Sequence, residues 1–276
     1  MRLKTYVINL ERSTARRQHM QAILAPYDFL DVEFVKAIDG RSLPEEELQT
    51  RFDHKKSKSL YGRRLNAGEV GCALSHRMVY DRLLSDGFDY ALVFEDDIDF
   101  KRDLNSIDWE EVDKVMRRSR PRALMLSGDF CFYRKKPLVR IYSAVGAYAY
   151  IINKAAARII LRRTTPCCVA DEWLYYKRKG VRLFALYPYV VDANLNMEQL
   201  SSDVKQDTWG IDRSQMALKE VVIGAITGTI KKLFKEYDHF EYKTRVVGNK
   251  IVGRRKTHRE IRREKHAARF SDTRSR

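Results

Sequence analysis

The chain has 276 residues, and its 44% hydrophobic content is enough for a folded core and excludes a wholly disordered protein. Its 53 Lys and Arg residues outnumber its 37 Asp and Glu residues, which gives a formal charge of +16. This balance favours an anionic partner, whether a nucleic acid, an anionic membrane surface or a phosphorylated substrate.

Predicted strands and helices alternate along most of the chain. Strands are predicted at residues 5–10, 34–38, 90–94, 123–126, 143–152 and 181–186, and Gly146 is expected to break the strand at 143–152. Helices are predicted at residues 14–24, 68–84 and 154–162, with one short helix near residues 44–49 of an otherwise loop-like stretch, 41–66. This alternation predicts an α/β fold with a mixed, mostly parallel sheet that is flanked by helices on both faces. Ligands of such sheets bind at the carboxyl ends of the strands, which directs attention to residues 9–13 and 95–99.

The composition changes after about residue 205. Residues 214–236 have a helical apolar pattern, and residues 254–265 carry seven Lys and Arg residues against two Glu residues. We therefore expect one domain over residues 1–205 and a helical, basic and partly flexible C-terminal extension over residues 206–276. The basic segment has two interpretations. It is either a disordered, solvating tail or a contact with an anionic membrane, where each Lys or Arg contributes about 1 kcal/mol.

The expected compartment is the cytoplasm. Glu11 and Arg12 soon interrupt the N-terminal apolar stretch, which is unlike a signal peptide, and no apolar run approaches the ~20 residues of a membrane span. The four cysteines contain no CxxC pair and no zinc-like spacing, so reduced thiols are expected. With the basic extension, these features predict a cytoplasmic protein with a peripheral position at the inner face of the cytoplasmic membrane.

Four acidic residues follow the buried strand that is predicted at residues 90–94. They are Glu95, Asp96, Asp97 and Asp99, and like charges beside a dry interior repel one another. A hard divalent cation such as Mn²⁺ or Mg²⁺ prefers oxygen ligands and can bridge carboxylates to a diphosphate, so a bound cation would relieve this repulsion. The alternative is an acidic turn whose Asp side chains cap the next segment.

Four sequence blocks, taken in order, resemble glycosyltransferase family 25. The blocks are VINLERS at residues 7–13, GEVGCALSH at 68–76, FEDD at 94–97 and YAYII at 148–152. They resemble the INLxRS, GExGCxLSH, (L/F)EDD and YxYxIS patterns of the family, which includes bacterial lipopolysaccharide and lipooligosaccharide galactosyltransferases and the collagen galactosyltransferases. Together the blocks cover the chain to about residue 175, where Asp171-Glu172 falls at the family's acid after a proline-containing loop.

The resemblance implies a GT-A-like fold with a Rossmann-like nucleotide half. It also implies an inverting, metal-dependent transfer of a hexose, with galactose favoured, from a UDP-sugar to a glycan or lipopolysaccharide-core acceptor. The implied partners are the UDP-sugar donor, a lipid-linked glycan acceptor and, through the basic C-terminus, an anionic membrane surface.

The resemblance also implies three groups of site residues. The proposed ligands of a Mn²⁺ or Mg²⁺ ion are Glu95, Asp96 and Asp97, in a segment that departs from a strict DxD pattern. Asp171 or Glu172 is the candidate catalytic base, and the alternative is a surface acid. The candidate donor-binding residues are Asn9, Arg12, Arg16, Ser75 and His76. For the arginines the alternative is a solvated basic helix, and for His76 it is a structural hydrogen bond.

Two other functions compete with this interpretation. A nucleic-acid-binding module would use the net charge and the Arg-rich tail, but the sequence has no stacking-aromatic or helix-turn-helix motif, so no nucleic-acid partner is expected. The acidic cluster also has no role in such a module. A nucleotidyl or sugar-phosphate transferase would keep the same fold and change only the reaction.

Overall fold

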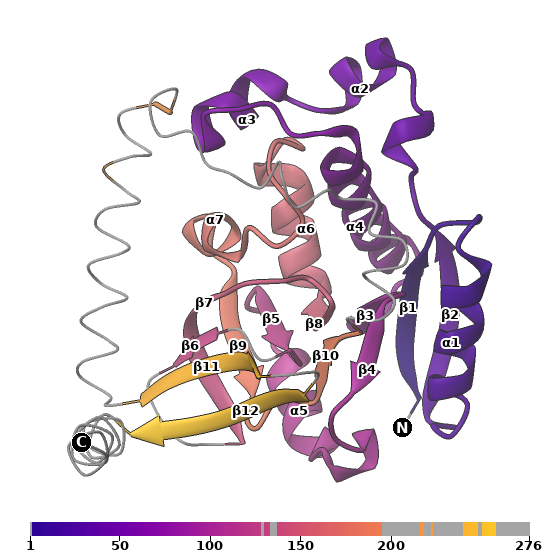
Figure 1. Ribbon diagram of the computed structural model, residues 1–276, viewed down its shortest axis with the longest axis vertical. Coiled ribbons are helices and arrows are strands. Elements are labelled where there is room, and N and C mark those ends of the chain that lie inside the picture. The colour runs from indigo at the N-terminus through magenta and orange to yellow at the C-terminus, as the bar shows by residue number, and fades with distance from the viewer. Residues whose placement is uncertain are drawn as a thin grey trace, which may run out of the picture.

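The computed structural model describes residues 2–127, 130–132, 137–194, 216, 217, 222, 240–247 and 250–257. Its centre is a mixed sheet of eight described strands in the order β2-β1-β3-β8-β5-β9-β7-β6 (Figure 1). These strands are β1 (Leu3–Asn9), β2 (Leu30–Lys36), β3 (Tyr90–Glu95), β5 (Arg122–Met125), β6 (Phe130–Phe132), β7 (Leu138–Ala144), β8 (Ala149–Asn153) and β9 (Arg182–Leu186).

Most strands of this sheet point the same way. β1 pairs in parallel with β2 and β3, and β5 pairs in parallel with β9. β8 runs antiparallel between β3 and β5, and β7 runs antiparallel to β9 and β6. Only β7 and β8 therefore oppose the other described strands of the sheet. The prediction of a mixed, mostly parallel sheet is confirmed.

Helices cover both faces of the sheet, as predicted. They are α1 (Thr14–Leu24), α2 (Glu45–Arg51), α3 (His54–Tyr61), α4 (Ala67–Ser85), α5 (Trp109–Met116), α6 (Lys154–Arg163) and α7 (Trp173–Arg178). Alternate residues of β3 pack into two different cores, one on each face of the sheet, because successive side chains of a strand point to opposite faces. Ala91 and Val93 pack in the core that holds α4 and α6, which lie side by side, whereas Leu92 and Phe94 pack with α1 and α5 (Figure 1).

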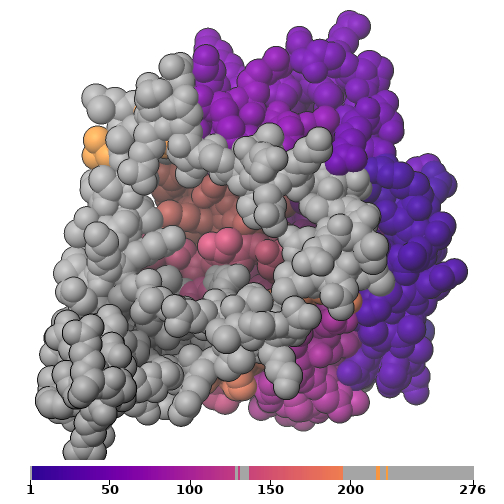
Figure 2. Space-filling model, in the orientation of Figure 1, coloured from indigo at the N-terminus to yellow at the C-terminus, as the bar shows by residue number. Residues whose placement is uncertain are grey.

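Two predicted segments differ in part from the structure. The break predicted at Gly146 within residues 143–152 is confirmed, because Gly146 turns the chain with a φ of +82° between β7 and β8, but β7 begins earlier than predicted, at Leu138. Residues 41–66 hold the helices α2 and α3 rather than a loop with one short helix. The Asp53 side chain caps α3 by accepting from the Lys56 amide, and Gly62 ends it in the left-handed region. Figure 2 shows this purple α2–α3 segment on the molecular surface beside the indigo segment of β1, α1 and β2.

Four further strands form two small sheets. β4 (Ile98–Phe100) pairs with β10 (Val191–Ala193), so the acidic segment continues directly into a strand. β11 (Phe240–Val247) and β12 (Lys250–Thr257) form an antiparallel hairpin near the C-terminus, which the sequence analysis missed (Figure 1). The helix predicted at residues 214–236 lies almost wholly outside the described residues, as does most of the basic segment 254–265. None of the described helices is long and apolar enough to cross a bilayer.

A glycine contact holds the segment after β2 against α4. A Cβ atom on Gly71 would lie 2.6 Å from both the Gly40 amide nitrogen and the Ile38 carbonyl oxygen, and one on Gly40 would lie 1.8 Å from the Ala67 carbonyl oxygen. Only glycine at both positions permits this approach of the 3-10 helix η1 (Gly40–Ser42) to the first turns of α4.

Replacing Gly71 with Ala should therefore lower the free energy of unfolding by about 1–3 kcal/mol, because the new methyl group overpacks the contact. Alanine is otherwise the better helix former by about 1 kcal/mol, so the sign of the change isolates the steric effect. Urea denaturation measures it. Gly87→Ala is the comparison without a steric contact: its Cβ would meet nothing within 4 Å, and its φ of +78° alone should cost about 1–2 kcal/mol. Stabilisation by Gly71→Ala would contradict the contact.

Candidate active site

The candidate site lies where the carboxyl ends of β1 and β3 meet. The parallel register pairs Ile8 with Glu95, so the next residue of β1, Asn9, stands beside Asp96. Asn9 is 2% exposed, and its Nδ2 donates to Asp96 Oδ2 at 2.6 Å and to the Ser13 carbonyl at 3.2 Å. The strand pairing thus joins two sequence blocks that are 87 residues apart.

Arg16, from the first turn of α1, binds the acidic segment. Its Nη1 donates to Asp96 Oδ1 at 2.9 Å and to Asp97 Oδ2 at 3.2 Å. Burial raises the pKa of Asp96, and the hydrogen bonds from Asn9 and Arg16 act in the opposite direction. Both oxygens of Asp96 accept hydrogen bonds within the protein, one from Asn9 and one from Arg16.

His76 connects the acidic segment to a buried tyrosine pair. Its Nε2 lies 3.1 Å from Glu95 Oε1, and its Nδ1 lies 2.7 Å from the Tyr150 hydroxyl. Tyr150 in turn lies 3.0 Å from the Tyr80 hydroxyl, and burial raises the pKa of both tyrosines. The sequence analysis named His76 but missed both tyrosines. Tyr150 belongs to the YAYII block, so that block was the available signal.

The two adjacent candidate bases have different surroundings. Asp171 accepts a hydrogen bond from the Gly146 amide at 2.9 Å. Burial raises the pKa of Asp171, the Gly146 amide lowers it, and the negative charge of Glu95 raises it further. Glu172 instead accepts a hydrogen bond from the Tyr61 hydroxyl of α3 at 3.0 Å. Asp171 therefore lies within the electrostatic reach of the acidic segment, and Glu172 is held toward α3.

Ser75 and Arg12 contact the wall of the pocket. Ser75 Oγ accepts from the Ile38 amide at 2.8 Å and donates to the Gly71 carbonyl at 2.7 Å, so it fastens the segment after β2 to α4. Arg12 is half exposed and forms an ion pair with Asp39 of the same wall. Asp39 was not among the candidate residues of the sequence analysis.

A single pocket collects most of these side chains. It is lined by Ile8, Leu10, Arg16, Ala37, Ile38, Asp39, Gly40, Arg41, Gly68, Cys72, Ser75, His76, Glu95, Asp96 and Asp97. Of the candidate residues, Arg16, Ser75, His76 and the three acids line this pocket. Asn9 supports it through Asp96, whereas Arg12, Asp171 and Glu172 do not line it. Cys72, His76 and Glu95 also bring a thiol, an imidazole and a carboxylate within 4.8 Å of one another.

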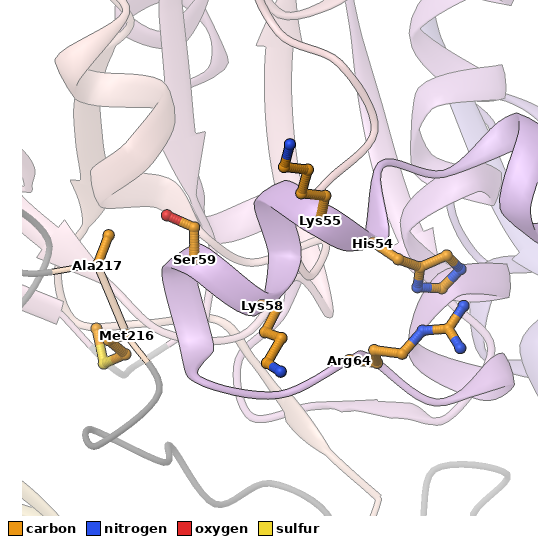
Figure 3. A pocket seen from close by; sticks show the side chains of 7 residues that line it. All are labelled: His54, Lys55, Lys58, Ser59, Arg64, Met216 and Ala217. Atoms are coloured by element: carbon orange, nitrogen blue, oxygen red, sulfur yellow. The ribbon is translucent and has the colours of Figure 1, made fainter.

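A second, basic pocket lies along α3. It is lined by His54, Lys55, Lys58, Ser59, Arg64, Met216 and Ala217. In Figure 3 the His54 ring and the Arg64 guanidinium lie close together, while Lys55 and Lys58 extend from different sides of the helix. Burial and the charge of Arg64 lower the pKa of His54. Tyr61, whose hydroxyl binds Glu172, belongs to the same helix but does not line this pocket.

Comparison with known proteins identifies the family. The model of glycosyltransferase family 25, described as an LPS biosynthesis protein, matches residues 2–174. A protein of Acanthamoeba polyphaga mimivirus that is named as a glycosyltransferase, R655, is 30% identical over 227 residues, which cover 74% of this chain and 67% of that protein.

Two vertebrate relatives are similar over a shorter part of their length. Procollagen galactosyltransferase 1 of Danio rerio is 27% identical, with 58% of this chain and 28% of that protein covered. A family 25 member 3 of Bos taurus, whose name describes it as inactive, is 28% identical, with 62% and 31% covered. The chain thus spans less than a third of these two proteins. The family match covers more than half of the chain, from β1 into α7, and the chain belongs to glycosyltransferase family 25.

Proposed function

We propose that this chain transfers a hexose from a UDP-sugar to a hydroxyl group of a glycan acceptor, with inversion at the anomeric carbon. The observation that carries the proposal is that Glu95 and Asp97 line one pocket of a family 25 fold, while Asp171 lies close enough for the charge of Glu95 to raise its pKa. Galactose is the favoured sugar because a relative of this chain is named a galactosyltransferase.

The residues at the end of β3 fit a hard divalent cation. Glu95 and Asp97 both line the pocket, and carboxylate oxygens are the ligands that Mn²⁺ and Mg²⁺ prefer. Asp96 is better suited to positioning, because Asn9 and Arg16 occupy its two oxygens. A cation bound by Glu95 and Asp97 would neutralise charge on the departing UDP. Arg16 contacts both Asp96 and Asp97 and would keep the segment in place when the donor leaves.

Asp171 is the proposed base. Transfer with inversion requires a group that accepts the proton of the acceptor hydroxyl as its oxygen attacks the anomeric carbon. The raised pKa of Asp171, which burial causes, makes its carboxylate more basic than an exposed one. The Gly146 amide binds Oδ2 of Asp171, and Oδ1 would accept the proton of the acceptor hydroxyl. Glu172 would act as a positioning residue, because Tyr61 fixes it against α3.

The acceptor is proposed to be a lipid-linked glycan such as a lipopolysaccharide core. The basic pocket on α3 offers Lys55, Lys58 and Arg64 to the anionic groups of such an acceptor. A peripheral position at the inner face of the cytoplasmic membrane, through the basic C-terminus, belongs to the same proposal.

Measured UDP release tests the proposal. The purified chain with a lipooligosaccharide acceptor should release UDP from UDP-galactose or UDP-glucose with Mn²⁺ and stop with EDTA. Asp97→Asn should lower the rate of UDP release by at least about 100-fold, because the negative charge on the departing UDP would no longer be neutralised by a bound cation. Asp99→Asn is the matched control, because Asp99 lies in β4, contacts His19 and does not line the pocket. Analysis of the product separates hexose transfer from sugar-phosphate transfer.

Metal binding gives a readout that does not depend on turnover. Titration of the free protein with Mn²⁺, followed by electron paramagnetic resonance, should show binding that Asp97→Asn weakens and Asp99→Asn does not. Folded protein that releases no UDP from any donor, and that binds RNA until the basic tail is deleted, would instead support the nucleic-acid-binding alternative.

A further inference from the structure

Four arginines form a cluster at the amino ends of β5 and β9, at the end of the sheet opposite the candidate active site. Arg118 and Arg120 lie in the loop before β5, Arg122 begins β5, and Arg182 begins β9; with Ser119 they line one recess. β5 runs in the same direction as β3, since both are antiparallel to β8. The amino ends of β5 and β9 are therefore far from the carboxyl end of β3, where the acids lie.

Arg122 is buried with an unsatisfied hydrogen-bond donor. It is 5% exposed, and its Nε has no hydrogen-bond acceptor. Its guanidinium stacks on the Phe184 ring at 5.1 Å from the centroid, which fixes the plane of the group. Burial, followed by the charges of Arg118, Arg182 and Arg120, lowers the pKa of Arg122. A buried cation beside three like charges is unfavourable unless an anion accompanies it.

No acidic side chain of the described residues pairs with any of the four arginines. The neighbouring Arg117 shows the contrast, because its Nε donates to Asp113 at 2.8 Å and its Nη1 donates to Asp89 at 3.0 Å. The acids of this region are thus taken by Arg117 and by Lys154, which also pairs with Asp89. The arginine cluster keeps its positive charge uncompensated within the described part of the chain.

The loop that carries Arg118 and Arg120 is held in place by one buried side chain. Asn153 is 1% exposed, and its Nδ2 donates to the carbonyls of Met116, Arg118 and Arg120 at 3.1, 3.1 and 2.9 Å. Its Oδ1 accepts from the Arg122 amide at 3.0 Å. The loop carbonyls therefore turn inward to Asn153, and the backbone of the cluster is organised before any ligand binds.

We propose that this arginine cluster is a binding site for a phosphate-class oxyanion, separate from the donor pocket. Guanidinium groups match the geometry of phosphate oxygens and donate paired hydrogen bonds to them. A phosphate group would give the Arg122 Nε an acceptor and offset the charges of Arg118, Arg120 and Arg182. The phosphate belongs either to a soluble compound or to a lipid headgroup, and the same chemistry recognises both.

Titration calorimetry with inorganic phosphate and with pyrophosphate, at constant ionic strength, tests the site on the full chain. The double variant Arg118→Ser/Arg120→Ser should bind the anion at least about tenfold more weakly than the wild type, as expected when two charge-assisted contacts are lost. The matched control is Arg162→Ser/Arg163→Ser, which removes the same charge from two exposed residues at the end of α6. That control should bind like the wild type.

A lipid source is distinguished by sedimentation with vesicles. If the site binds a headgroup, phosphatidylglycerol vesicles should bind Arg118→Ser/Arg120→Ser at least about tenfold more weakly than the control double variant, which has the same net charge and the same basic C-terminus, and phosphatidylcholine vesicles should retain neither. Arg122→Met adds a second measurement, because its melting temperature should be insensitive to phosphate. Equal phosphate affinity and equal vesicle binding in the two double variants would overturn the proposal, whatever the transferase assay shows.

Discussion

Replacing Asp171 with Asn should lower the turnover number for sugar transfer by about 10²–10⁴-fold, the range expected when a general base is removed. Asparagine keeps the shape of the side chain and an oxygen that accepts from the Gly146 amide, so the pocket should keep its form. The donor should still bind, because Asp171 does not line the pocket that holds Arg16 and the acidic segment. Steady-state kinetics should therefore show a large loss in kcat with a small change in the donor KM.

The same substitution should stabilise the folded protein at neutral pH. Burial raises the pKa of Asp171, so the native state binds its proton more tightly than the unfolded chain does. The charged carboxylate is therefore unfavourable in the fold above this pKa, and Asn removes that charge. Each kcal/mol gained should raise the melting temperature by about 2–4 °C for a chain of this size. The advantage should shrink as pH falls through the folded pKa and vanish below the ordinary value of about 3.9.

Glu172→Gln is the matched control, because it changes the adjacent acid and leaves the Tyr61 hydroxyl with an acceptor. Its kcat should fall by less than about tenfold, since a positioning residue acts only through its neighbours. A pH–rate profile completes the test: the wild-type rate should fall on the acid side as Asp171 is protonated. If Glu172→Gln lost more activity than Asp171→Asn, the assignment of the base would be wrong.

The sequence predicts the elements that have a strong apolar period or a clear boundary. Helix α1 begins and ends at the predicted residues, and β3 extends the predicted strand by one residue, because its apolar run stops at Glu95. Helices α5 and α7 were missed. α5 has only eight residues behind its Asp108 cap, and α7 has six. Burial of Trp173, whose Nε1 donates to the Gly146 carbonyl, supports α7, and such a tertiary contact leaves no local pattern.

The candidate site was predictable where it lies in short motifs and not where it depends on strand order. Asn9, Arg16 and the acids come from conspicuous blocks, and parallel pairing of β1 with β3 brings them together. Asp171 and Glu172 are adjacent acids, and no periodic pattern in the sequence shows which of them faces the site. The fold distinguishes them, because the turn at Gly146 reaches one and Tyr61 of α3 reaches the other.

Replacing Arg16 with Met should lower the free energy of unfolding by about 3–5 kcal/mol, the range for a buried ion pair that loses one partner. The Arg16 side chain is 13% exposed, and its partners Asp96 and Asp97 are 9% and 20% exposed. Without the guanidinium, two carboxylates would face each other next to Glu95 with no described cation between them. Urea denaturation measures the loss.

Arg12→Met is the matched control for this variant, because Arg12 also stands near the end of β1 and pairs with an acid. Its side chain is 46% exposed, so its pair with Asp39 should contribute no more than about 1 kcal/mol. A loss in Arg16→Met no larger than that in Arg12→Met would contradict the buried ion pair.

The dependence on pH and on a second substitution should identify Asp96 as the source of the instability of Arg16→Met. Burial already raises the pKa of Asp96, and Arg16 opposes that rise, so removing Arg16 should raise the pKa further. The native variant then binds a proton that the unfolded chain does not, and its deficit should shrink as pH falls through this raised pKa. Arg16→Met/Asp96→Asn should recover part of the loss at pH 7, because Asn keeps an oxygen for Asn9 without the buried charge. The coupling energy of this double-mutant cycle reports the contact that ties α1 to the acidic segment.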